Sequence, residues 1–132
     1  MTVTAARRAR SDAGALILSY VIIVPVFLLA LMIITQGAMW FLARSAALAA
    51  ARQGVDAARV EPVSLQAGTR EARLFARRAA HGYLQVTGVD ASRSTAATIV
   101  ISVTGRVPSI VVGMPITVTQ VAEAPVERFT AP

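Results

Sequence analysis

The hydrophobic pattern is dominated by one uncharged run near the start of the chain. From Ala13 to Ala43 no residue carries a formal charge at neutral pH, and most residues of the run are aliphatic. A helix of about 20 apolar residues crosses a hydrocarbon core of about 30 Å. In a chain of 132 residues nothing else is large enough to cover such a helix on all sides, as a buried core helix requires. The run therefore predicts a transmembrane helix, which we place at residues 15–43.

This helix is expected to continue beyond the bilayer over residues 44–60. The stretch RSAALAAARQGVDAARV has high helix propensity, and no proline follows until Pro62. From about Ala15 to about Arg59 the helix would be roughly 65 Å long, more than a bilayer needs. Small residues recur at every fourth position, on two adjacent faces. One face carries Ala43, Ala47 and Ala51, and the other carries Ala46, Ala50 and Gly54. Such faces favour close helix packing, although alanine is also the best helix former.

Pro25 lies inside the predicted span. It removes one helical hydrogen bond and crowds the preceding turn, which predicts a kink or a local loosening. Prolines are also tolerated in membrane helices without any functional role.

A second helix is expected after Pro62. Ser64 is placed to cap it, the stretch LQAGTREARLFARRAAHGYL continues it, and Gly82 or Gly88 lies near its end. One face carries Ala72, Phe75, Ala79 and Tyr83, whereas Arg70, Arg73, Arg77 and Arg78 point elsewhere. We interpret the arginines as a solvated face; contact with anionic headgroups or an acidic partner is the alternative.

The pattern then changes from helical to alternating. In TIVISVTG, Ile99, Ile101 and Val103 point one way and the hydroxyl residues the other, as in a half-buried strand. RVPSIVVGMP supplies a turn, and ITVTQVAEA returns with Ile116 and Val118 matching. Two strands alone are marginal, so they must pack on a helix or on another subunit. The predicted fold is α+β: a long transmembrane helix that continues beyond the bilayer, a second helix, and a small antiparallel hairpin or sheet within residues 61–132.

Charges flank the membrane helix on both sides. Arg7, Arg8 and Arg10 precede it in a basic leader, residues 1–14, and an equal number of arginines follows it up to Arg59. The leader arginines are closer together, and a short tail is easier to retain than to translocate. This favours a cytoplasmic N-terminus and an extracytoplasmic C-terminus, with the protein in the cell membrane.

Composition removes several classes of function. The net charge of +6 comes from scattered arginines, without a basic stripe interleaved with aromatics, so direct nucleic-acid binding is not expected. There is no cysteine, His81 is the only histidine, and the acidic residues show no ligand spacing. No glycine-rich phosphate loop follows a strand. We therefore expect no catalytic, cofactor-binding or metal site, and no enzyme.

A basic leader, a glycine, an over-long apolar helix and a small α+β remainder together resemble a pilin. More narrowly, the chain is similar to the TadE-like pseudopilins of the tight-adherence (Tad) pilus and of related type II secretion and type IV pilus systems. The resemblance covers GALILSYVIIVPVFLLALM, ARSAALAAARQGVDAARV and VTGRVPSIVVGMPITVTQVAEAPVERF. It implies a single-pass membrane protein that works in assembly, with lipid, other pilin or pseudopilin subunits and a prepilin peptidase as partners.

The resemblance also implies a processing site. A prepilin-type peptidase would cut between Gly14 and Ala15, and the fifth and sixth residues after the cut, commonly glutamate and an aromatic residue, are here Ser19 and Tyr20. A carboxylate at that depth needs a partner charge, which in pilins is a neighbour's N-terminal amine, and Ser19 cannot neutralise an amine. This suits a minor, initiating or tip-located pseudopilin, or a member anchored without processing. By itself, Gly14 is equally a flexible residue at the membrane interface.

Two alternatives stay open. The first is a signal-anchored envelope protein whose outer part binds a ligand or partner and never joins a pilus. A secretory signal cleaved after SAALAAA, near Arg52, is the other, although its apolar region would be about twice the usual length of about 7 to 15 residues.

Overall fold

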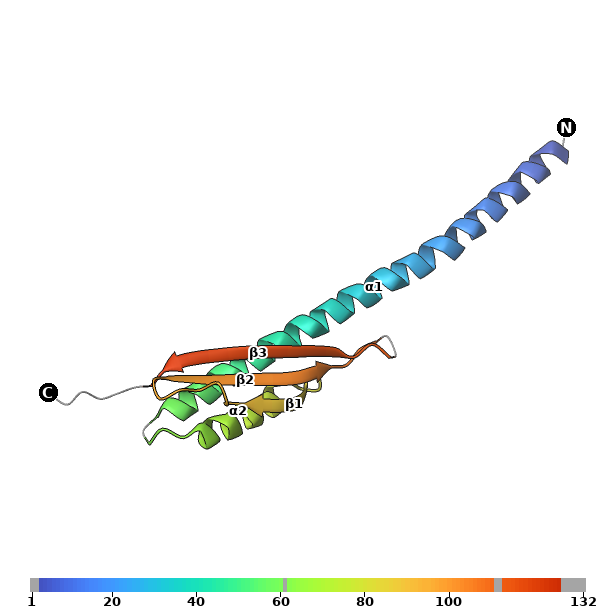
Figure 1. Cartoon of the computed structure of the whole chain (residues 1–132). Coiled ribbons are helices and arrows are strands. Elements are labelled where there is room, and N and C mark those ends of the chain that lie inside the picture. Colours follow the sequence, from blue (N-terminus) through green and yellow to red (C-terminus); the bar gives the residue numbers. More distant parts are fainter. Residues whose placement is uncertain (1–2, 61, 111–112, 127–132) are drawn as a thin grey trace. The chain divides into compact units, whose positions relative to one another are not determined.

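The computed structural model describes residues 3–60, 62–110 and 113–126 (Figure 1). Five elements follow one another along the chain. They are α1 (Val3–Arg59), α2 (Leu65–Ala79), β1 (Gln85–Asp90), β2 (Thr98–Val107) and β3 (Ile116–Pro125). The α+β class, the long apolar first helix and the second helix are confirmed, and the predicted hairpin is part of a three-stranded antiparallel sheet. The chain forms two compact units, Met1–Thr35 and Gln36–Pro132, so that the boundary falls within α1.

Helix α1 is helical without interruption from Val3 to Arg59, with Pro25 inside it. The proline therefore does not end the helix. In the first unit the side chains from Tyr20 to Ile34 point outward, and most of them are exposed aliphatic groups.

Helix α2 begins where the sequence predicts. The Oγ of Ser64 accepts a hydrogen bond from the Ala67 backbone N–H at 3.2 Å, which satisfies one of the free donors of the first turn. The helix ends at Ala79, and the chain then turns through two residues with positive φ, His81 and Gly82. Gly82 is thus near the helix end as expected, whereas Gly88 belongs to β1.

The buried face of α2 differs in part from the predicted one. Gly68, Ala72, Ala76 and Ala80 are buried, and only Ala72 was in the predicted set. Phe75 and Ala79 are half-buried, and Tyr83 lies beyond the helix and is exposed. The row of small residues is the one that faces inward because α1 approaches α2 too closely for larger side chains.

The sheet has the order β1-β2-β3, with both pairs antiparallel. Ile99, Ile101 and Val103 on β2 are buried, as their alternation predicts, and Val118 on β3 lies opposite Gly105. The first strand was not predicted. Its sequence, QVTGVD, contains a register shift between Val86 and Gly88, which hides the alternation.

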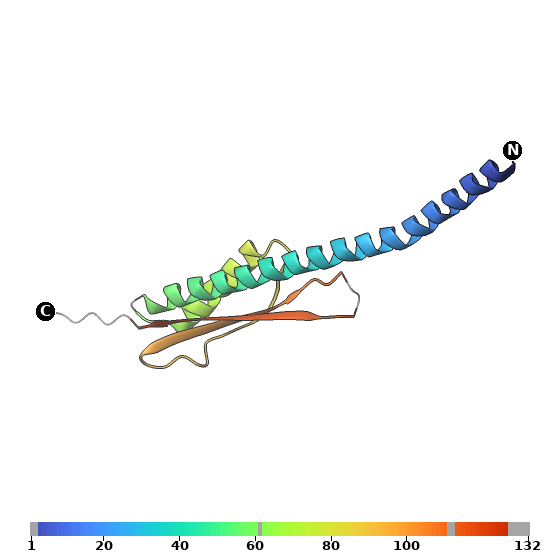
Figure 2. The ribbon, with the colours of Figure 1, turned by 90° about the horizontal axis from the view of Figure 1, so that it is seen from above.

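Both helices of the second unit lie on one face of the sheet (Figure 2). The core combines alanines of α1 and α2 with the aliphatic side chains of β2. The helices approach most closely where Gly54 faces Gly68. A Cβ added at Gly54 would lie 2.7 Å from the Ala72 Cβ and 2.8 Å from the Gly68 carbonyl oxygen. Because both contacts are with rigid atoms, this crossing requires glycine.

Candidate functional site

The apolar part of α1 is the first candidate site. Among the described residues, one helical stretch, Ser19–Arg59, is long and apolar enough to cross a membrane, with a window of mean hydropathy 2.5 that is not buried. The side chains of Tyr20, Phe27 and Ile33 are 65%, 61% and 72% exposed within the chain. A helix that is apolar on all sides and uncovered by its own chain requires an apolar surrounding. By this criterion α1 is a single-pass membrane anchor.

The expected processing junction lies inside α1. Gly14 and Ala15 have helical backbone, and the surroundings of side chains before Ser19 are outside the described structure. A peptide bond in a helix must unwind before a peptidase binds it, and glycine lowers that cost by about 1 kcal/mol relative to alanine. Both Ser19 and Tyr20 are exposed on the helix surface. The backbone at Gly14 is thus easier to open than that of an alanine-only helix.

The small residues of the α1 continuation are covered by the same chain. All of the predicted packing positions except Ala46 are buried, and Ala46 is half-buried. The buried ones are Ala43, Ala47, Ala50, Ala51 and Gly54. The helix that packs against Gly54 is α2, with Ala72 and Gly68 as its nearest neighbours. These buried positions are therefore not available as a surface for another subunit.

The same packing bears on a cleaved secretory signal. A cut after Ala51 would remove Ala43, Ala47, Ala50 and Ala51, all of which are 0% exposed in the core. Their loss would uncover the aliphatic face of β2, including Ile99 and Ile101. The folded second unit therefore needs the helix on both sides of that candidate cut.

An aromatic and cationic group marks the start of the second unit. Trp40, Phe41 and Leu42 are exposed, and the guanidinium of Arg44 lies 5.5 Å from the centre of the Trp40 ring. Tryptophan favours the membrane–water interface, and arginine can extend its charged end to the headgroups. This group was not predicted from the sequence, although the only tryptophan lies one turn before the first cation after the span.

The arginines of α2 lie on its outer surface. All four are exposed, as a solvated face requires. Arg78 lies 3.6 Å from a carboxylate oxygen of Glu71, with the arginine side chain 70% exposed. Exposed pairs of this kind contribute little to stability. The face therefore keeps its positive charge available to solvent or to an anionic partner.

The ionisable groups of the sheet and of the turn after α2 are further candidate site residues. Hydrogen bonds from the Ser92 side chain and backbone lower the pKa of the exposed Asp90, which closes the turn after β1. His81 sits in the left-handed turn after α2 and is exposed. Within the described ranges, no three histidine, cysteine or acidic side chains gather as metal ligands would.

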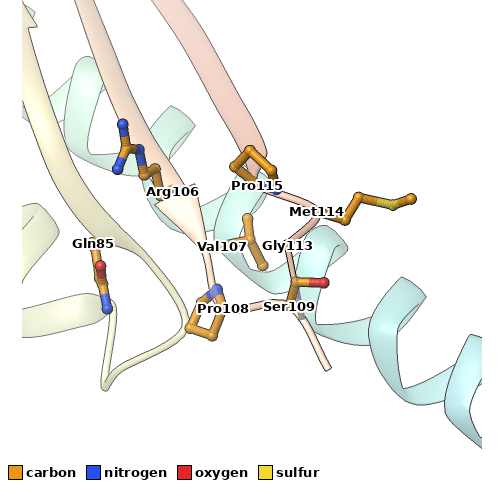
Figure 3. A pocket seen from close by; sticks show the side chains of 8 residues that line it. All are labelled: Gln85, Arg106, Val107, Pro108, Ser109, Gly113, Met114 and Pro115. Atoms are coloured by element: carbon orange, nitrogen blue, oxygen red, sulfur yellow. The ribbon is translucent and has the colours of Figure 1, made fainter. Parts of the chain in front are cut away.

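An open hollow of about 450 Å³ lies at the end of the sheet where β2 leads into β3 (Figure 3). Its lining combines a single cation, Arg106, with Gln85 and with Pro108 and Pro115 on the connecting loop. Figure 3 shows Arg106 and Met114 extending to opposite sides of this hollow. Such a surface is amphipathic, with charge on one side and an apolar side chain on the other.

Comparison with known families places a match on α1. The model of the family described as TadE-like protein matches residues 14–56. The match begins at Gly14, the residue before the expected cut, and covers the apolar helix and most of its packed continuation. No curated protein and no solved structure matches the chain significantly. The resemblance to the TadE-like family that the sequence predicts is thereby confirmed over residues 14–56, about a third of the chain.

Proposed function

We propose that this chain is a minor pseudopilin that contributes to the assembly of a Tad or type IV-like pilus or of a secretion pseudopilus. The main support for this proposal is that the TadE-like match coincides with the apolar helix and its packed continuation. The family and the helix together indicate a Tad-pilus-related membrane protein. The proposal adds the subunit role, a cytoplasmic N-terminus, and processing by a prepilin peptidase between Gly14 and Ala15.

The exposed surface of α1 supports an assembly role. Most side chains from Tyr20 to Phe41 are exposed within the chain, and Met32, Gln36 and Met39 are half-buried. Inside the membrane, lipid covers these side chains. Outside the membrane, exposing them to water costs roughly 25 cal/mol per Å² of apolar surface, and other apolar helices can cover them instead. The helices of other pilin or pseudopilin subunits have the matching chemistry. In this proposal the chain catalyses no reaction and requires no cofactor.

Ser19 supports a minor or initiating position. A shaft subunit with a carboxylate at this depth neutralises its neighbour's N-terminal amine, and the hydroxyl of Ser19 cannot. A subunit that begins or caps a filament has fewer such neighbours to satisfy. The Tyr20 ring, which is exposed, keeps the other half of the pilin pattern.

Deletion of the gene in the native cell tests this role. We expect loss of surface pili or of the secretion that depends on them, with recovery when the full chain is supplied in trans. Recovery should fail with a chain whose first unit is replaced by an unrelated single-pass helix, because that helix lacks the pilin surface. Normal pili, adhesion and secretion after deletion would support the alternative, a signal-anchored envelope protein that binds a partner with its outer part.

A further inference from the structure

The side chain of Gln36 on α1 makes two hydrogen bonds to the loop between β2 and β3. The Nε2 of Gln36 donates to the Pro108 carbonyl at 3.3 Å, and its Oε1 accepts from the Ile110 backbone N–H at 2.9 Å. This arrangement fixes the orientation of the amide, because a carbonyl needs a donor and an N–H needs an acceptor. All these groups belong to the second compact unit. In Figure 2 the same end of the sheet lies alongside α1.

The position of Gln36 along α1 fixes its depth. If about 20 residues of the uncharged run lie in hydrocarbon, the edge of the hydrocarbon falls between about residue 32 and Ala43. At about 1.5 Å per residue, Gln36 is between roughly 6 Å outside and roughly 10 Å inside this edge. The headgroup layer is roughly 5 to 7 Å thick on each side. In every register, therefore, Gln36 and the loop groups that it binds lie within roughly 6 Å of the hydrocarbon edge or deeper.

The loop has the chemistry that this depth requires. Its described residues carry no charge, and the side chains of Ile110 and Met114 are 40% and 60% exposed. At its base Arg106 extends to the other side of the hollow from Met114 (Figure 3). Apolar side chains beside one cation suit the boundary between acyl chains and phosphates.

We propose that Ile110 and Met114, which flank residues 111–112 of the β2–β3 loop, make a second membrane contact by inserting into the leaflet through which α1 leaves the bilayer. Arg106 then faces the lipid phosphates. Gln36 is the positioning residue, because its two hydrogen bonds hold the loop at the depth of the helix. The contact fixes the tilt of the second unit at the membrane surface. It requires the membrane anchor alone, so a failed pilus role would leave it intact.

The test uses the absence of native cysteine. The full chain carrying Met114→Cys is labelled with an environment-sensitive fluorophore and reconstituted into vesicles of phosphatidylcholine and phosphatidylglycerol. Glu123→Cys, exposed near the other end of β3, is the matched control. We expect nitroxide-bearing lipids to quench the label at position 114 by roughly threefold more than the label at position 123. Equal quenching at the two positions would overturn the proposal.

Two further measurements separate lipid contact from other causes. Gln36→Leu should bring the quenching at position 114 down to that at position 123 while the thermal transition of the second unit is retained, since the core residues are untouched. If Gln36→Leu leaves the quenching at position 114 unchanged, Gln36 does not position the loop. Quenching at position 114 that appears only as the protein is diluted in lipid would assign the loop to a second copy of the chain and would also overturn the proposal.

Discussion

Replacing Gly54 by alanine is expected to destabilise the second unit strongly, although alanine is the better helix former. The added Cβ would meet the Ala72 Cβ at 2.7 Å and the Gly68 carbonyl oxygen at 2.8 Å, and neither atom can move without moving a helix. Helix propensity returns about 1 kcal/mol, whereas overpacking and separation of the helices cost about 3 kcal/mol. The net loss of about 2 kcal/mol should lower the melting temperature of the full chain in detergent by roughly 8 to 16 °C.

Gly37→Ala is the matched control for this substitution. Gly37 lies in the same helix, and a Cβ added there meets nothing within 4 Å. This variant should melt at the parent temperature or slightly above it, since the unfolded chain loses freedom. Gly68→Ala, whose Cβ would lie 2.6 Å from the Gly54 carbonyl oxygen, should behave like Gly54→Ala. A Gly54→Ala protein that melts with the parent would show that the two helices do not cross at this point.

Gly14→Asp is expected to abolish processing in cells that have an active prepilin peptidase. The peptidase must accept the residue before the cut, and a charged, branched side chain replaces the smallest one. Membrane insertion should be unchanged, because the apolar residues that follow Ala15 still exceed the length that a bilayer requires. Intact-mass spectrometry should find the parent starting at Ala15 and the variant retaining its leader.

Ser11→Asp provides the control for charge alone. It adds the same carboxylate to the leader without altering the residue before the cut, so it should be processed like the parent. Equal processing of Gly14→Asp and the parent would contradict a cut at this position. If the parent protein retains its leader in such cells, the chain is not processed by the prepilin peptidase.

The sequence predicts the elements whose signal is local. The absence of charge from residue 13 to residue 43 predicts the membrane anchor. The alternation of Ile99, Ile101 and Val103 predicts which side of β2 is buried. The Ser64 cap is equally local, because its acceptor and donor are three residues apart. These features need no knowledge of the rest of the chain.

The features that escaped prediction depend on distant residues. Gln36 finds its partners 72 and 74 positions away, and nothing near it in sequence indicates them. The buried row of α2 is set by the approach of Gly54, and the bulge between Val86 and Gly88 hides the alternation of β1. Sequence also identified the small residues of α1 as packing positions without identifying the same chain as their cover.

Single-cysteine labelling in intact cells tests the account most directly, since the chain has no cysteine of its own. We predict that Arg93→Cys, in the turn before β2, reacts with a membrane-impermeant maleimide from outside, and that the protein stays in the membrane after alkaline extraction. Thr4→Cys is combined with Gly14→Asp, so that the leader is not removed. This cysteine should react only after the membrane is permeabilised. Release of the protein by alkali, or labelling of Thr4→Cys but not Arg93→Cys from outside, would contradict it.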